Sequence, residues 1–479
     1  MSKRPNFIFI TTDQQRFDTI QCLGADHMLT PHLNWLVETG INFNRGYAES
    51  PVCVASRACM LTGRHFHRMQ DCGWWGQPTT DRVEETLPAC LTRAGYQTHG
   101  YGKFHYHPPH RNYGWEHMET LDFYYRELRM QRPDRLRAMD HGLGQNEMEP
   151  AFATVHENDS LTRWTVERGI RFLETRDDSR PYCLYLGFSK PHPPFDPPHN
   201  YWSLYQNRTL PEPVYGDWSQ DKEKLPGGFM ESTWALNGCD NWSPESIRET
   251  RRAYYALITQ IDYQLGNLFA RLRELGQLDN TVIVFTSDHG EMLGDHHMGA
   301  KNVFLEPSAH VPFILRPSEA MKHLRGTTCD SIACMADILP TFCNLAGAEI
   351  PERCDGIDLL AQANREARRE RLFHLCSPTA GILDGHLKYT WSYAGGDELM
   401  FDLATDPMEQ HDLIRAGTHQ ADHQRLRRAL AEEMERNGHD FAQAGDLVPT
   451  LPPLDRAQKR TNAWPGFHSA DNESHDILH

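Results

Sequence analysis

Two short apolar runs of the sequence each end at an acidic residue that is followed by another potential metal ligand. The first run leads to Asp13 and Gln14, and the second leads to Asp288 and His289. If both runs are strands of one parallel sheet, their carboxyl ends meet at the same edge and bring these side chains together. Carboxylate and amide oxygens suit hard divalent cations such as calcium, magnesium or manganese. A lone acid after a strand is more often a helix N-cap, so the predicted metal site depends on both strand ends together.

A third segment, PVCVASRACMLTGR at residues 51–64, places Cys53 between a loop and a predicted helix. Backbone N–H groups and the helix dipole favour an anion at such a junction, and Arg57 can turn back toward the same point. A single cysteine near an arginine is most often an inert buried thiol. Cys53 becomes a candidate for chemistry only through the residues that other segments bring near it.

Further basic side chains follow predicted strands or lie in the loop after Asp288. They are Lys103, His105, His192 and Lys301. Taken singly, each is a typical solvated or salt-bridged surface group. Together with Arg57 and a metal, they provide what a tetrahedral oxyanion ester needs: a polarised oxygen, neutralised charge and proton transfer.

The elements that must position these side chains alternate between strand and helix, which favours an α/β fold with a largely parallel sheet. The predicted strands are 6–11, 97–102, 181–188, 281–286 and 311–315, and the predicted helices are 31–39, 58–62, 86–94, 161–176, 244–275 and 337–347.

The pattern changes after residue 365, so we expect a catalytic domain at 1–365 and a smaller α+β subdomain at 366–445. The subdomain would hold a hairpin formed by 387–393 and 398–402, and a helix at 424–435. The tail 446–479 is rich in Pro, Asp and His and is predicted to be an extended arm, which could pack on a neighbouring subunit of a homo-oligomer.

Composition limits the classes of partner. The 479 residues carry 48 Lys and Arg against 65 Asp and Glu, a net charge of −17, which argues against a nucleic-acid groove. We find no apolar run of the roughly 20 residues that a membrane span needs. The twelve cysteines show no CxxC pairs. Without an export signal we expect reduced thiols and a cytoplasmic protein, or a periplasmic one if a signal peptide was removed.

Several motifs resemble, in order, those of the type I sulfatases of the alkaline phosphatase superfamily. The matching segments are 6–16, 51–64, GYGKFH at 100–105, PHPPF at 191–195, TSDHGEMLGDHH at 286–297 with Lys301, MFDL at 400–403 and DP at 406–407. The resemblance implies an alkaline phosphatase-like α/β fold: a large mixed, mostly parallel sheet flanked by helices, with a smaller C-terminal α+β subdomain.

The resemblance also implies a reaction. A formylglycine-generating maturation enzyme would oxidise Cys53 to formylglycine, whose hydrate is a geminal diol. One oxygen, held by the metal, attacks sulfur and displaces the alcohol, and the second hydroxyl then loses its proton and expels sulfate. The implied metal ligands are residue 53 with Asp13, Gln14, Asp288 and His289. Calcium is the expected ion, with manganese or magnesium as alternatives.

The remaining roles also come from the resemblance. Arg57 and Lys103 would hold the nucleophile and its charge, and His105 would be the base for sulfate release. His192 and Lys301 would bind the sulfate and assist the leaving group.

Two departures from the family pattern bear on this interpretation. Ala55 stands where the aerobic maturation motif prefers proline, but alanine is compatible with the radical-type route. Gln14 and His289 stand where several members have Asp and Asn. This pair is common in bacterial sulfatases and in the related phosphonate monoester and phosphodiester hydrolases, and its lower negative charge can favour manganese.

Three functions therefore remain open. The first is hydrolysis of a sulfate ester, of a carbohydrate or an aryl alcohol. The second is phosphonate monoester or phosphodiester hydrolysis by the same residues, and the third is silent oxyanion binding with an unconverted Cys53. Substrate choice would lie in the loops 106–158 and 201–243 and around Trp74 and Trp75. Aromatic side chains there could stack on a sugar ring, and His107, His110 and Arg111 could contact acidic sugars. The same aromatic side chains can equally pack the loops against the protein.

Overall fold

The computed structural model describes residues 4–69, 79–109, 111–131, 141, 143–144, 146–221, 225–229 and 242–453. Within them the largest sheet has eight strands in the order β5-β4-β6-β1-β7-β8-β2-β9. The strands are β1 (Asn6–Asp13), β2 (Ile41–Phe43), β4 (Gln97–Gly102), β5 (His117–Glu119), β6 (Tyr182–Pro191), β7 (Thr281–Ser287), β8 (Phe313–Arg316) and β9 (Thr327–Cys329).

Most neighbouring strands of this sheet are parallel, and β8 alone runs antiparallel to both its neighbours. The central strand β1 pairs with β6 and β7, and Phe7 lies opposite both Cys183 and Val282. The register with β6 shifts between Thr11 and Asp13. Because β1, β4, β6 and β7 run the same way, the loops that follow them leave from one edge of the sheet, as the sequence predicts.

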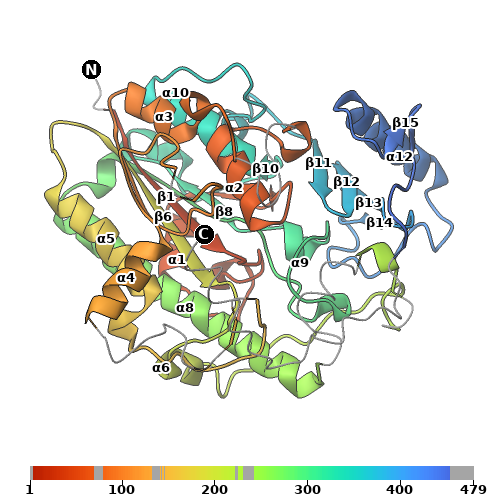
Figure 1. The fold of residues 1–479 in the computed structure, drawn as a ribbon, viewed down its shortest axis with the longest axis horizontal. Helices are drawn as coiled ribbons and strands as arrows, with labels where there is room; N and C mark the ends of the chain where they lie inside the picture. The colour runs from red at the N-terminus through yellow and green to blue at the C-terminus, as the bar shows by residue number, and fades with distance from the viewer. Residues whose placement is uncertain are drawn as a thin grey trace.

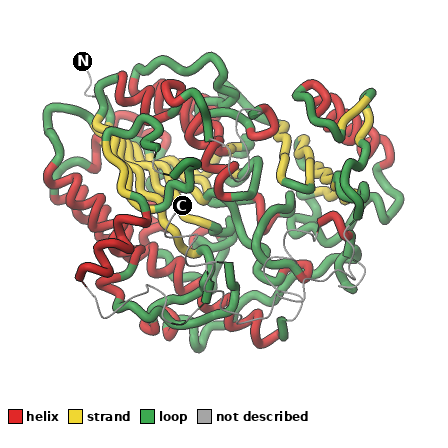
Figure 2. Tube along the Cα trace, in the orientation of Figure 1, coloured by secondary structure: helices red, strands yellow, loops and turns green. Residues whose placement is uncertain are grey.

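Helices cover both faces of the sheet (Figures 1 and 2). The α-helices of the described residues are α1 (Pro31–Glu38), α2 (Cys53–Thr62), α3 (Leu87–Arg93), α4 (Leu121–Gln131), α5 (Leu161–Thr175), α6 (His199–Ser203), α8 (Pro244–Glu274), α9 (Glu306–Ala309), α10 (Ile338–Ala346), α11 (Leu359–Ala363) and α12 (Gln420–Arg436).

The two faces of β1 build separate cores because side chains alternate along a strand. Phe7 and Phe9 pack with residues of α2, α3 and α10, whereas Ile8 and Ile10 pack with residues of α1, α5 and α8. β1 is buried on both faces along its whole length, as expected for a central parallel strand.

A smaller antiparallel sheet lies at the side of the molecule, on the right in Figure 1, with α12 packed against it. Its strands are β11 (Arg371–Cys376), β12 (Thr379–Asp384), β13 (Leu387–Ser392) and β14 (Glu398–Asp402). The predicted hairpin is therefore half of a four-stranded sheet. The short strand pairs β3 (Gly46–Tyr47) with β10 (Ala333–Cys334), and β15 (Ala442–Gln443) with β16 (Asp446–Leu447), complete the set. The domain boundaries at 365 and 445 stay predictions.

Two other expectations differ from the structure. The helix expected at 58–62 begins at Cys53, because Val52 is extended and the helical turn starts with the next residue. The segment 106–158, expected to be irregular, contains β5 and α4. α4 buries Tyr124 and Leu128, one turn apart. This helical spacing was not recognised because the surrounding segment is rich in histidine, proline and arginine.

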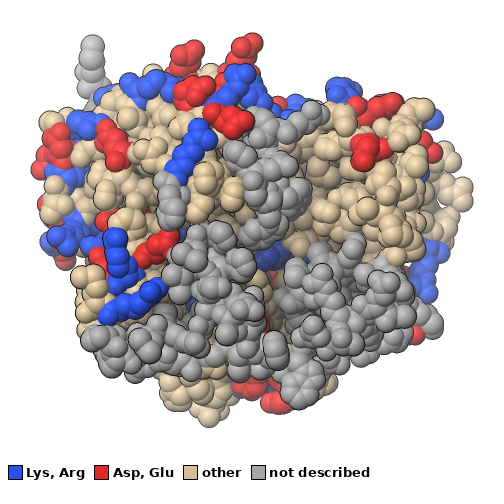
Figure 3. Space-filling model, in the orientation of Figure 1, with Lys and Arg blue, Asp and Glu red and all other residues tan. Residues whose placement is uncertain are grey.

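The described surface mixes charges of both signs. On the face drawn in Figure 3, acidic and basic side chains are interspersed around the rim. None of the described helices combines the length and apolar character that a membrane-crossing helix needs.

Candidate active site

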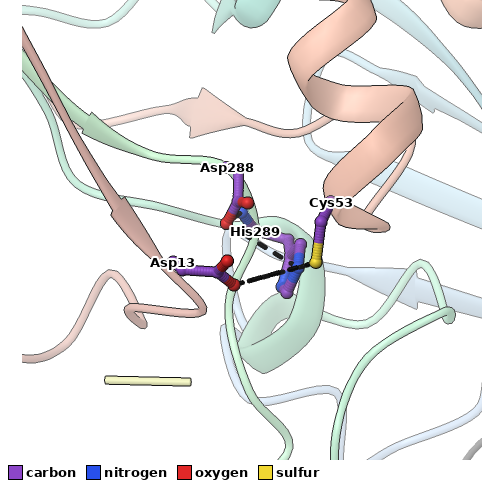
Figure 4. Close-up of side chains that lie close together, drawn as sticks. All are labelled: Asp13, Cys53, Asp288 and His289. Atoms are coloured by element: carbon purple, nitrogen blue, oxygen red, sulfur yellow. Dashed lines mark hydrogen bonds and ion pairs between the residues drawn. The ribbon is translucent and has the colours of Figure 1, made fainter. Parts of the chain in front are cut away.

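Four potential metal ligands meet at the carboxyl edge of the large sheet (Figure 4). Asp13 ends β1, Asp288 and His289 follow β7, and Cys53 is the first residue of α2. One ligand atom from each lies within 4.8 Å of the others, and all four residues are buried. The Sγ atom of Cys53 is 3.1 Å from Nε2 of His289 and 3.7 Å from Oδ1 of Asp13.

The ring of His289 is oriented for ligation. Its Nδ1 atom lies 2.9 Å from the carbonyl oxygen of Gly290. A carbonyl only accepts, so Nδ1 carries a proton, and Nε2 is the ring atom that faces the cluster. Nε2 lies 3.8 Å from Asp13 and 3.7 Å from Asp288.

Arg57 joins the two carboxylates from α2, one turn beyond Cys53. Its Nε atom donates to Asp288 at 2.9 Å, and its Nη2 atom lies 3.5 Å from Oδ2 of Asp13. Its Nη1 atom donates to the carbonyl of Lys103 and to the hydroxyl of Tyr185, both at 2.7 Å. The guanidinium is thereby fixed on both edges and is only 1% exposed.

Lys103 supplies a second cation to the same carboxylate. Its Nζ atom lies 2.6 Å from Oδ2 of Asp13. His105 follows in the same loop with a left-handed backbone, φ 52°. A hydrogen bond joins the His105 and Cys53 side chains. The loop after β4 thus brings both of its predicted site residues to the nucleophile position.

The other pair of predicted sulfate-binding residues also meets here. Nζ of Lys301 lies 3.3 Å from Nε2 of His192 and 2.6 Å from the side-chain oxygen of Gln14. Nδ1 of His192 lies 2.8 Å from the carbonyl oxygen of Pro193. His192 is therefore protonated on Nδ1 and accepts from Lys301 on Nε2.

Comparison with known proteins identifies the group to which this arrangement belongs. The sulfatase family model matches residues 5–348. The chain belongs to the sulfatase family. It is 30% identical over 477 residues to an arylsulfatase of Clostridium perfringens, covering 94% of this chain and 98% of the relative. It is 26% identical to an N-acetylglucosamine-6-O-sulfatase of Bacteroides thetaiotaomicron, covering 90% of this chain and 86% of that protein. The protein is therefore a sulfuric ester hydrolase.

Solved structures agree on the fold. A phosphonate monoester hydrolase of Agrobacterium radiobacter superposes with a TM-score of 0.73 at 24% identity, covering 91% of this chain and 95% of that one. A structure in complex with its substrate D-glucosamine-2-N,6-O-disulfate gives a TM-score of 0.72 at 23% identity, covering 92% and 99%. The predicted alkaline phosphatase-like fold of this sulfatase is confirmed.

The sulfatase site holds several charged side chains close together and buried. Burial and the Cys53 thiol raise the pKa of Asp13, but Lys103, His192 and Arg57 outweigh them and lower it to about 2. Burial and the neighbouring Asp13 raise the pKa of Asp288. Asp13 is thus held as an anion. The nearby positive charges do not fully offset the burial of the Asp288 carboxylate, so a bound cation would stabilise its ionised form most.

Cys53 and the two loop histidines also have shifted pKa values. Burial raises the pKa of the Cys53 thiol, but Lys301, Lys103 and His289 lower it well below its usual value. Burial, followed by Lys301 and Lys103, lowers the pKa of His192 to about 4. Burial also lowers the pKa of His105. Both histidines are therefore neutral near pH 7.

The donor set in this sulfatase fits a divalent metal. Two buried carboxylates and an imidazole face a common point, with the side chain of residue 53 as the fourth member. A sulfur ligand suits zinc, whereas an oxygen at residue 53 would suit calcium, magnesium or manganese. Gln14 stands beside the cluster, but its side-chain oxygen faces Lys301.

Sequence reasoning missed two supporting residues. Glu291 is fully buried; it accepts from the Gln14 side chain, and its Oε1 atom accepts from the backbone N–H groups of Leu293 at 2.8 Å and Ala300 at 2.6 Å. Tyr185 holds Arg57 through its hydroxyl. Glu291 could have been found as the second acid in the Asp288 loop, whereas Tyr185 sits inside a strand with no local signal.

Some predicted substrate-contact residues lie outside the described residues. These are Trp74, Trp75 and His110, together with residues 132–140, 142, 145, 222–224 and 230–241 of the two loops. The predicted C-terminal arm beyond residue 453 also lies outside the described residues.

Proposed function

We propose that this sulfatase hydrolyses the sulfate ester of a carbohydrate and that residue 53 acts as a formylglycine made from Cys53. The supporting observation is the convergence of Cys53 with Asp13, Asp288 and His289 inside a ring of cations. A maturation enzyme is required because the unmodified thiol lacks the second hydroxyl group of the hydrate, whose deprotonation expels sulfate.

In this proposal, Asp13, Gln14, Asp288, His289 and residue 53 hold one divalent metal, with calcium as the expected ion. The metal would polarise a sulfate oxygen and favour the ionised nucleophile. The side-chain oxygen of Gln14 lies 2.6 Å from Nζ of Lys301. To join the metal ligands, this oxygen turns away from Lys301.

The chain's own side chains provide the remaining steps. Arg57 and Lys103 fix the carboxylates and the nucleophile. Neutral His105, hydrogen-bonded to residue 53, takes the proton when sulfate is released. Lys301 and His192 bind the sulfate group, and the Lys301 ammonium donates to the departing alcohol oxygen.

The names of relatives support a sugar sulfate without identifying it. One relative is an N-acetylglucosamine-6-O-sulfatase, another an arylsulfatase and a third a choline-sulfatase. Phosphonate monoester or phosphodiester hydrolysis is the alternative, because two phosphonate monoester hydrolases share the fold with TM-scores of 0.73 and 0.76.

A substrate panel tests the proposal. Purified, metal-supplemented enzyme is assayed on sulfated mono- and disaccharides, an aryl sulfate, choline sulfate and an aryl phosphonate. We expect the highest kcat/KM on a sulfated sugar. A preference of orders of magnitude for the phosphonate would replace the proposal with its alternative.

The state of residue 53 is measured on the same preparation. Mass spectrometry of the Cys53 peptide distinguishes an aldehyde from a thiol. An unmodified thiol in protein from its native host, with no turnover on the panel, would indicate a silent oxyanion-binding protein instead.

A further inference from the structure

A second group of potential metal ligands lies outside the catalytic cluster. It consists of Glu49, His65 and Cys334, whose ligand atoms lie within 4.8 Å of one another. Glu49 precedes Cys53 in the chain, and His65 follows the end of α2. Cys334 ends β10 and caps the 3₁₀ helix η11 (Met335–Asp337). The group thus connects both ends of the nucleophile segment to a third part of the chain.

The carboxylate of Glu49 is buried and forms no ion pair with a lysine or arginine of the described residues, although the Arg369 guanidinium interacts with it from farther away. Glu49 is 1% exposed. It accepts from the backbone N–H groups of Met335 at 3.1 Å and Ala336 at 3.3 Å, and Nδ1 of His65 lies at 3.3 Å. Among the described residues, no lysine or arginine nitrogen lies within 4.0 Å of it. A buried charge in this position is costly unless a cation joins it.

The donor atoms are those that zinc prefers: a carboxylate oxygen, an imidazole nitrogen and a sulfur. Cys334 is fully buried. The His65 side chain is 13% exposed.

We propose that Glu49, His65 and Cys334 form a second metal site, for a zinc-type divalent ion, with a water on the open side. The ion neutralises Glu49 and ties the segments before and after α2 to the start of η11. It is separate from the catalytic ion and does not depend on formylglycine. The competing explanation is that a protonated His65 alone neutralises Glu49.

Cobalt(II) is the probe, because a thiolate ligand gives it a charge-transfer absorption that oxygen and nitrogen ligands do not. The measurement uses a Cys53→Ala protein, which lacks the sulfur of the catalytic cluster, with calcium in excess. We expect one equivalent of cobalt to produce the thiolate band, zinc to displace it, and zinc to protect Cys334 from alkylation.

Three variants in the Cys53→Ala background identify the site. Cys334→Ser should abolish the band, whereas Cys343→Ser, which removes another buried cysteine from α10, should keep it. Glu49→Gln keeps an acceptor for the backbone N–H groups and the thiol, and should weaken zinc binding at least about tenfold. It keeps the proposal testable if Cys334→Ser fails to fold. The absence of a thiolate band, or a band that survives both Cys334→Ser and Glu49→Gln, would overturn the second site in favour of the His65–Glu49 pair.

Discussion

The ammonium nitrogen of Lys301 lies 2.6 Å from the side-chain oxygen of Gln14. Gln14 follows β1, whereas Lys301 lies at the end of the long loop after β7. The contact joins the predicted metal ligands to the residues predicted to bind sulfate. Because the Gln14 oxygen must leave Lys301 to bind the metal, changes at either residue should affect both metal binding and chemistry.

Replacing Lys301 with Met should lower kcat/KM by roughly 10²- to 10³-fold, because a charge that stabilises the transition state is removed. Lys301→Arg should recover part of the loss. The exposed Lys322, which pairs with Glu319, provides the control variant Lys322→Met with unchanged rates. Steady-state kinetics on the best substrate measure all three. Wild-type kcat/KM in Lys301→Met would contradict the role assigned to this lysine.

Glu291→Gln should loosen the loop that carries Lys301. The carboxylate accepts from Gln14 and from two backbone N–H groups, and an amide in its place must turn its NH₂ group toward one of these donors. We expect a loss of about 1–3 kcal/mol in unfolding free energy and a lower kcat. Calorimetric metal titration should also show weaker binding, by about tenfold.

The control for Glu291 is Glu349→Gln, at an exposed glutamate that follows α10. If Glu291→Gln lost stability but kept its metal affinity and kcat, Glu291 would be structural only.

Metal removal should destabilise the enzyme as well as inactivate it. Asp288 is buried beside Asp13, and both burial and that neighbour raise the pKa of Asp288. A chelator should lower Tm, and calcium at about 100 times its Kd should restore about 2.7 kcal/mol. Differential scanning calorimetry with calcium, manganese and magnesium ranks the ions.

Asp288→Asn removes the charge repulsion and weakens metal binding. Its Tm should therefore change little on chelation. A chelator-induced shift as large as that of the wild type would show that the stabilising ion binds elsewhere.

Ala55→Pro should make Cys53 a better substrate for aerobic maturation. Ala55 lies in the first turn of α2, where the earliest helical bond runs from Ser56 N–H to the Val52 carbonyl, so proline at 55 removes no such bond. Packing a proline where Ala55 is 1% exposed should cost about 1–3 kcal/mol. Peptide mass spectrometry after aerobic expression measures conversion. Equal conversion in Ala55→Pro, Ala55→Gly and wild type would refute the prediction.

His374 should make the protein less stable in acid. Burial, followed by the Lys388 ammonium, lowers the pKa of His374 to about 3. The unfolded chain takes up this proton below about pH 6.5, whereas the folded protein does not. The stabilising contribution is therefore present above pH 6.5 and is lost as the pH falls toward 3, by up to about 1.4 kcal/mol per pH unit.

Urea unfolding of wild type and His374→Gln between about pH 5 and 7 measures this difference. The variant should show the shallower dependence, and the exposed His386 gives the control His386→Gln. Parallel curves for wild type and His374→Gln would exclude His374 as a source of acid sensitivity.

The sequence alone determined the fold class and the positions around which the site is built. Runs such as 282–285 are apolar throughout, which indicates buried parallel strands, and Asp13 and Asp288 lie a few residues beyond such runs. These signals are local, because strand ends and spacing are written in consecutive residues. The same locality explains why β11 and β12 were missed: a short strand is recognised only once its partners are present.

The tertiary structure decided which side chains meet. Strand order puts β1 between β6 and β7, and so brings Asp13 beside Asp288, and Tyr185 beside Arg57. The contacts of Glu291 with Gln14 likewise join residues far apart in the chain. Such pairings arise because burying both faces of the sheet fixes the neighbours of each strand. This constraint depends on the whole chain, so no short stretch of sequence predicts it.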